Sequence, residues 1–352
     1  MTTPDAASAP RPSLNGGRWG RSALLTVGSA AVSAAVLGVL WFANDLDAGA
    51  LARAFDQVSA AQLLAICAAS ALFHIFVGAH KSQCVLRSMG VPIGFREALA
   101  VRLGADPLRL LLPLRSGELA QMLYFWARKD VALSRASGLA IFDRGLNLFG
   151  ALFWLALGVA LLPEPLRWLQ AATGCSDALV LRIAMMLLVA VVAVIIFLWA
   201  PLSKPATAAV SRVSARLGRV LQGMTAPLDE LSPWRKVFFL AYGIVFQTRP
   251  LLVCWALLWA HGVAVDLDRL LARASVAVLA GQLPGTMAGA GPRETALVEL
   301  LDDGVTAPEV LLSVGLWMTL AVNVIPMLLG LPWTLWFVRS LRRPGRSVEE
   351  DR

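Results

Sequence analysis

Charged residues are scarce in this sequence. Only 15% of its 352 residues are Asp, Glu, Lys or Arg, whereas 58% are hydrophobic. The mean hydropathy is correspondingly high, at +0.68. Soluble domains contain about a quarter charged residues, so the composition excludes an ordinary soluble protein and predicts an integral membrane protein.

Cysteine and histidine are also rare. None of the four cysteines forms a C-x-x-C motif, and the three histidines lack the spacing of metal ligands. This pattern favours small buried cysteines over a disulfide framework or a metal centre. His74 falls within an apolar stretch, where it is either a packing residue or a proton carrier, and the sequence favours packing. We therefore expect no metal and no other cofactor.

The chain nevertheless carries a formal net charge of +8. In a soluble protein this excess would indicate nucleic acid as a partner. Here most Lys and Arg residues lie between hydrophobic stretches, where the positive-inside rule and anionic lipid headgroups account for them. We therefore expect the bilayer as a partner and no nucleic acid.

Six apolar stretches are long enough to cross the hydrocarbon core of a membrane, which needs about twenty helical residues. They lie at Ser22–Ala43, Ala61–Ala79, Ser137–Leu162, Ala178–Ala200, Lys236–His261 and Glu309–Val338. The segments between them alternate between basic and acidic. This alternation predicts a multi-pass, all-α protein of the cytoplasmic (inner) membrane with both termini in the cytoplasm. Residues 1–21, expected to be disordered, and residues 339–352 are then cytoplasmic tails.

Two interrupted apolar stretches stand between these spans, one near 98–126 and one near 270–301. Each is broken by proline and glycine next to an Arg and a Glu, and the two breaks are about half the chain apart. This arrangement is typical of an internal repeat. We therefore predict two membrane halves, 22–165 and 178–338, each with a re-entrant helical hairpin, in an inverted repeat.

The charges at the two breaks point to a binding site. A charge at the bilayer centre costs about 2.5–3.5 kcal/mol, and a broken helix frees backbone polar groups, so both features belong in protein or at a wet cavity. Helix N-termini beside arginines favour an anionic headgroup. The candidate headgroup-binding residues are Arg115, Gly117, Glu118, Gly289, Gly291, Arg293 and Glu294. The alternative is that each Arg–Glu pair is a buried salt bridge that fixes its hairpin against the bundle.

A third polar motif, FDRGLN, opens the third predicted span. Asp143 and Arg144 are expected either to pair with the first hairpin or to extend to the membrane interface. Asn147 lies one turn further into the span. These three residues are supporting candidates for the site.

At these motifs the sequence resembles the lysylphosphatidylglycerol synthase transmembrane family, the flippase-like domain family. The resemblance extends from the first span to the last. It rests on the motifs LPLRSGELAQ (112–121), FDRGLNLF (142–149) and LPGTMAGAGPRETAL (283–297).

The resemblance implies that the Arg and Glu residues of the two breaks handle lipid. It also implies a stand-alone member without the soluble aminoacyltransferase domain, so we expect no synthesis of lysyl-phosphatidylglycerol. Two positions depart from the family pattern. Pro292 stands where an apolar residue usually precedes Arg293, and Asn147 stands where family members often have Asp.

Three functions are compatible with the sequence. The leading hypothesis is a lipid translocator, without catalytic residues, that moves an anionic phospholipid or a polyprenyl-linked lipid between leaflets. The chain has no nucleotide-binding P-loop motif, so a gradient or downhill scrambling would supply the energy. The alternatives are a membrane-embedded transferase acting on a polyprenyl-phosphate or phospholipid, and a non-transporting scaffold for a lipid-modifying enzyme. Assembly into a homo-oligomer is left open.

Overall fold

A computed structural model describes most of the chain as helices. The residues described are 17–88, 90–111, 117–129, 131–161, 186–189, 204, 207–212, 214–229, 231–282, 286–287, 289–302 and 304–342. These residues contain no strand, and five of their helices are long and apolar enough to cross a membrane. The predicted all-α membrane fold is therefore confirmed.

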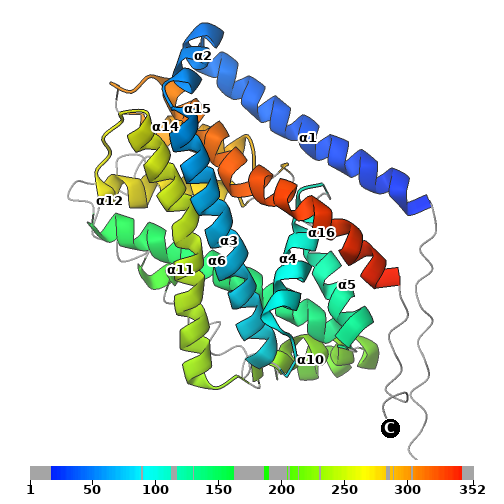
Figure 1. The fold of residues 1–352 in the computed structure, drawn as a ribbon. Helices are drawn as coiled ribbons and strands as arrows, with labels where there is room; N and C mark the ends of the chain where they lie inside the picture. Colours follow the sequence, from blue (N-terminus) through cyan, green and yellow to red (C-terminus); the bar gives the residue numbers. More distant parts are fainter. Residues whose placement is uncertain are drawn as a thin grey trace, which may run out of the picture.

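Figure 1 shows the arrangement of the helices. Two of them, η2 and η3, are π-helical segments. The order is α1 (Gly17–Ala43), α2 (Ala48–Asp56), α3 (Ala60–Ser88), α4 (Phe95–Leu111), α5 (Gly117–Lys129), α6 (Leu133–Leu161), α10 (Ala215–Asp229), α11 (Pro233–Ala260), α12 (Leu267–Arg269), η2 (Leu270–Ala274), α13 (Ser275–Ala280), α14 (Pro292–Leu301), α15 (Pro308–Thr319), η3 (Leu320–Val324) and α16 (Ile325–Arg342).

The five candidate spans coincide with five of the six predicted ones. They are formed by α1, α3, α6, α11 and the continuous α15–η3–α16. The predicted span at Ala178–Ala200 lies outside the described residues except for the helical residues 186–189. Helix α3 differs most from its prediction, because it continues past Ala79 to Ser88. The extension carries Lys81, which is buried inside the protein and so does not end the helix.

The outer faces of the spans are apolar. Phe42, Leu64 and Trp259 are 81%, 71% and 67% exposed, respectively. Large exposed hydrophobic side chains on several helices are unfavourable in water and favourable against lipid tails. The exposure pattern therefore agrees with the span assignment.

Both interrupted stretches contain helical arms on either side of the proline and glycine positions. In the first, α4 and α5 flank residues 112–116, which lie outside the described residues, and the carboxylate of Glu97 on α4 accepts hydrogen bonds from Tyr124 and Lys129 on α5. In the second, α12, η2 and α13 lead into the break and α14 leads out of it. Re-entry of these units into the membrane stays a prediction.

Corresponding elements of the two halves make corresponding contacts. The first arm of each hairpin lies against the last span of the other half, since α4 packs along α16 and η2 with α13 packs along α6. The second arms, α5 and α14, each pack against the span that follows them, α6 and α15. Helices α3 and α11 pack against each other in the middle of the bundle (Figure 1). An inverted repeat requires that corresponding elements of the two halves make corresponding contacts. The repeat itself stays a prediction.

Glycines bring the helices close together at three of these contacts. A Cβ on Gly150 of α6 would lie 2.3 Å from the carbonyl oxygen of Gly243 on α11. A Cβ on Gly330 of α16 would lie 2.3 Å from the carbonyl oxygen of Leu103 on α4, and one on Gly158 of α6 would lie 2.2 Å from a backbone nitrogen of η2. Small residues at helix crossings are the usual packing device of membrane helices.

The buried apolar side chains form two clusters with a polar layer between them. Along α3, one cluster reaches Cys67 and the other begins at Val85. Along α11, one cluster reaches Leu240 and the other begins at Leu251. The intervening turns of both helices carry buried charged side chains, which form the candidate site.

Candidate functional site

A layer of buried charged side chains crosses the middle of the bundle. Lys81 on α3, Arg102 on α4 and Arg249 on α11 are 1%, 5% and 7% exposed, respectively. His74 is the midpoint of α3 and Phe246 lies at the middle of α11, each about 20 Å from either helix end at 1.5 Å per residue. The layer therefore lies near the middle of α3 and α11.

Three cations converge on the ring of Phe246. The Nζ atom of Lys81 lies 5.0 Å from the ring centroid, and the guanidinium carbons of Arg102 and Arg249 lie 5.2 Å and 5.8 Å from it. A cation within about 6 Å of an aromatic centroid is attracted by the ring, more strongly when it is desolvated. Phe246 thus joins positive charges from three different helices.

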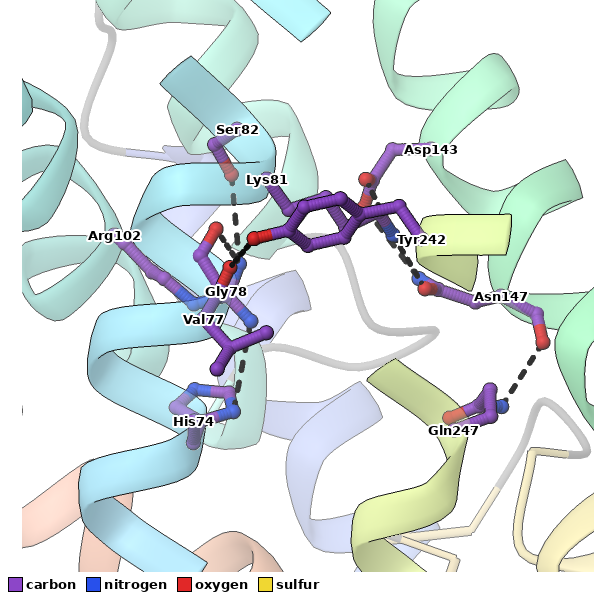
Figure 2. A network of polar contacts seen from close by, with 10 residues as sticks. All are labelled: His74, Val77, Gly78, Lys81, Ser82, Arg102, Asp143, Asn147, Tyr242 and Gln247. Atoms are coloured by element: carbon purple, nitrogen blue, oxygen red, sulfur yellow. Dashed lines mark hydrogen bonds and ion pairs between the residues drawn. The ribbon is translucent and has the colours of Figure 1, made fainter. Parts of the chain in front are cut away.

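Carboxylates balance part of this charge. The Nζ atom of Lys81 lies 2.8 Å from Oδ1 of Asp143 and donates to Oδ1 of Asn147 at 2.6 Å. The Nε2 atom of His74 lies 2.9 Å from Oδ2 of Asp106. Three cations against two carboxylates leave these five groups with one net positive charge while the histidine is neutral. Figure 2 shows the network around Lys81 and Arg102.

Arg102 lies directly against the backbone of α3. Its Nη1 atom donates to the carbonyl oxygen of Gly78 at 3.3 Å and lies 3.5 Å from the hydroxyl of Ser82, and its Nη2 atom lies 3.5 Å from Nδ1 of His74 (Figure 2). A Cβ on Gly78 would lie 2.4 Å from the guanidinium carbon. Only glycine at position 78 leaves room for this position of the arginine.

Neutral side chains connect α3, α6 and α11 around the layer. The hydroxyl of Tyr242 donates to the carbonyl oxygen of Val77 at 3.3 Å and lies 2.8 Å from Nδ1 of His80. The amide of Gln247 donates to the carbonyl oxygen of Asn147 at 3.0 Å. These bonds hold the three helices in register at the depth of the charges.

A cleft adjoins the layer between α3, α4, α5 and α6. Its polar lining includes Ser82, Arg102 and Asp143, the last with a side chain that is 34% exposed. The other lining residues are Val85, Leu86, Ala98, Val101, Gln121, Met122, Phe125, Ala136, Leu139 and Ala140. A cleft with charged groups on one part and apolar walls elsewhere has the chemistry of a site for an amphiphile.

The second hairpin break is held by Glu294, which is fully buried. This carboxylate accepts hydrogen bonds from the backbone nitrogen of Gly291 at 2.7 Å, from Nη2 of Arg293 at 2.9 Å and from the hydroxyl of Thr319 at 2.7 Å. Arg293 also contacts the Thr319 hydroxyl. Arg293 and Glu294 thus bond to each other and to Thr319 of α15. This is the geometry expected if the pair is a buried salt bridge that fixes the hairpin against the bundle.

Glycines and α1 complete the second break. Gly289 and Gly291 have φ angles of +79° and +99°, which L side chains rarely adopt, and a Cβ on Gly289 would lie 2.0 Å from a carbonyl oxygen. The backbone nitrogen of Met287 donates to the hydroxyl of Ser33 on α1 at 2.8 Å. Helix α1, at the edge of the bundle in Figure 1, therefore satisfies a backbone group that the break frees.

The two breaks relate differently to the cation layer. Arg115 lies outside the described residues, Gly117 begins α5, and Glu118 follows it in that helix. The second break reaches the layer through η3, where the carbonyl oxygen of Val322 accepts from Nη2 of Arg249 at 3.3 Å. The headgroup-binding role assigned to both breaks stays a prediction.

The chain also matches a known protein family. The family model described as "Lysylphosphatidylglycerol synthase TM region" matches residues 26–330, from α1 into α16. The chain belongs to this family. A comparison with curated proteins finds no match. Membership in the lysylphosphatidylglycerol synthase transmembrane family connects this multi-pass membrane protein with membrane lipid metabolism or translocation.

The three supporting candidates, Asp143, Arg144 and Asn147, lie in different environments. Asp143 and Asn147 both contact Lys81 in the layer, whereas Arg144 is exposed. Asn147 accepts from Lys81 as a neutral side chain, so it contributes to the layer without adding charge. Among the described residues no group of three His, Cys, Asp or Glu side chains is placed to hold a metal ion.

Sequence reasoning missed the cations of the layer, because Lys81 and Arg102 belong to the basic segment after the second predicted span and Arg249 is a single charge within an apolar stretch. A signal existed for one of them. Arg102 stands eleven residues before Pro113, and Arg273 stands eleven residues before Pro284, so the two hairpins share this arginine as well. Arg273 donates to the carbonyl oxygen of Leu300 at 2.8 Å. Matching the two breaks at their prolines would have identified the pair.

Proposed function

We propose that this protein is a lipid translocator that passes the anionic headgroup of a phospholipid or polyprenyl-linked lipid through the layer around Phe246. The observation that carries the proposal is the convergence of Lys81, Arg102 and Arg249 on one ring, buried near the middle of α3 and α11. In the proposal, this level lies at half-depth of the membrane. A headgroup that crosses a bilayer meets its highest energy at that depth.

The energetic argument rests on the cost of buried charge. Each cation in the bilayer centre costs about 2.5–3.5 kcal/mol on insertion scales. Packing alone does not explain the presence of three such cations. Lys81 and two arginines offer a phosphate several charge-assisted hydrogen bonds, each stronger than a neutral one.

The cleft supports the same function. Its apolar walls suit acyl or isoprenoid chains, and Arg102 lies where such a lipid would present its headgroup. In the proposal, this end of α3 and α6 lies on the cytoplasmic side of the inner membrane, with both termini there, because basic loops favour that side. In the proposal, lipid therefore enters the cleft from the cytoplasmic leaflet.

The hairpins take separate roles in this proposal. The first supplies Arg102 and two walls of the cleft, and Arg115 and Glu118 keep the headgroup contact expected of them. In the second, Arg293 and Glu294 fix the break against α15 rather than bind lipid. An inverted pair of hairpins would then exchange access between the leaflets around a fixed site.

The test is lipid translocation in reconstituted vesicles. Headgroup-labelled anionic and zwitterionic lipids are exposed to dithionite, which reaches only the outer leaflet. We expect wild type to allow bleaching well beyond about half of the anionic label. Arg102→Gln should slow this at least about tenfold, because a charge-assisted hydrogen bond contributes about 1.5–3 kcal/mol.

The matched control is Arg96→Gln, which removes an exposed arginine from the same helix. It should translocate like wild type. Bleaching that stops at half of the label for every lipid and variant would refute translocation. Mass spectrometry of the recovered lipids separates the transferase alternative, which requires a changed lipid.

A further inference from the structure

A buried histidine–carboxylate pair lies beside the cation layer. His74 and Asp106 have side chains that are 6% and 5% exposed, and their Nε2 and Oδ2 atoms lie 2.9 Å apart. His74 comes from the midpoint of α3 and Asp106 from α4, so the pair joins a candidate span to the first hairpin. Histidine is the side chain whose charge changes most readily near neutral pH, and such pairs in membrane interiors are typical proton carriers.

The surroundings of His74 tie its protonation to the anion site. Helix α4 presents Asp106 and Arg102 to the imidazole, and α11 presents Arg249 together with the Phe246 ring, whose centroid lies 6.1 Å from that of His74. Segment η3 contains no titratable side chain, and the charged residues of α16 lie in its last turn. One carboxylate and two arginines therefore surround the histidine.

Arg102 and a proton compete for the same atom. Nη2 of Arg102 lies 3.5 Å from Nδ1 of His74, an arrangement in which Nδ1 accepts and Nε2–H donates to Asp106. A proton taken from water onto Nδ1 removes that acceptor and repels the guanidinium. Conversely, an anion that draws Arg102 away leaves Nδ1 open to the proton.

We propose that His74 and Asp106 form a proton-binding site that takes up one proton when an anionic headgroup binds at the Phe246 layer. The inference rests on the proposed headgroup site and adds the ion that accompanies the lipid. A unit negative charge arriving about 6 Å away, at an effective dielectric constant of about 20, raises the proton affinity of the imidazole about 100-fold.

Calorimetry of lipid binding tests this directly. A short-chain phosphatidylglycerol is titrated into the purified full-length protein in detergent, in two buffers of different ionisation enthalpy, at several pH values from 5 to 8. The difference between the two heats gives the protons taken up per lipid bound. We expect uptake to reach a maximum of about 0.8 proton per lipid at some pH in that range, the limit set by a 100-fold change in proton affinity.

Two variants locate the proton. His74→Gln should bind the lipid without proton uptake, whereas His261→Gln, at the end of α11 where the imidazole contacts Ser313 rather than the layer, should behave like wild type. Asp106→Asn, which keeps the shape of the pair, should shift the pH of maximal uptake downward because it removes the anion beside the imidazole.

The outcomes separate the two proposals. Binding of the anionic lipid with no proton uptake at any pH overturns the proton site and leaves the headgroup site standing. Uptake that persists in His74→Gln also overturns it. Failure of wild type to bind the anionic lipid in preference to short-chain phosphatidylcholine overturns the headgroup site, and the proton inference with it.

Discussion

The Arg293–Glu294 pair gives the sharpest prediction about stability. Glu294 is 0% exposed and Arg293 is 4% exposed, and the carboxylate binds three donors from the break, from its neighbour and from α15. If the pair fixes the second hairpin, its loss should destabilise the protein. If it chiefly binds headgroups, its loss should impair lipid binding with little change in stability.

The magnitude follows from the geometry. Glu294→Gln keeps the shape of the side chain and an acceptor for Gly291, but it leaves the guanidinium of Arg293 buried without a counter-charge. Breaking a buried pair on one side costs about 3–5 kcal/mol. At 2–4 °C per kcal/mol for a large domain, even the lower figure lowers the thermal midpoint by roughly 6–12 °C.

The assay is thermal unfolding of the purified protein in detergent, followed by intrinsic fluorescence. The matched control is Glu299→Gln, an exposed glutamate on the same helix, which should unfold within about a degree of wild type. The double variant Arg293→Gln/Glu294→Gln should recover part of the loss, because both charges are then gone. A Glu294→Gln midpoint equal to that of Glu299→Gln would refute the role of the pair in fixing the hairpin.

Three further substitutions test other contacts. Gly78→Ala should displace the Arg102 guanidinium and weaken anionic-lipid binding about tenfold in calorimetry, although the alanine itself favours the helix by roughly 1 kcal/mol. Unchanged affinity would contradict the placement of Arg102. Gly150→Ala should lower the thermal midpoint because it separates α6 from α11, whereas Gly145→Ala on the same helix meets no atom within 4 Å and should not. Ser33→Ala should cost about 1–3 kcal/mol by leaving a backbone donor of the second break unsatisfied, measured as faster proteolysis of that loop.

The spans and the breaks were predictable from sequence because they depend on local properties. Length and apolarity decide whether a segment can cross a hydrocarbon core, and five of six predicted spans match candidate spans in the structure. Proline and glycine clustered within a few residues disfavour a continuous helix, so Gly289 and Gly291 marked the second break correctly. The end of α3 was wrong because Lys81 looked like a residue that leaves the membrane.

The depth and partners of isolated charges were not predictable. A lone Lys or Arg in an apolar stretch either ends a span or is buried in a bundle, and local sequence does not distinguish the two. Asp143 was expected to reach the first hairpin or the interface, and the sequence did not indicate its contact with Lys81 of α3. That partner depends on which helices pack together.

The sequence by itself therefore determined an all-α membrane protein with two broken helical units, because hydropathy and backbone geometry act over neighbouring residues. Only the tertiary structure decided that Lys81, Arg102 and Arg249 surround Phe246, and that Arg293 turns to its own neighbour Glu294. The reason is physical: a charge in a membrane protein is stabilised by groups that meet it in space, and those groups come from helices far apart in the chain.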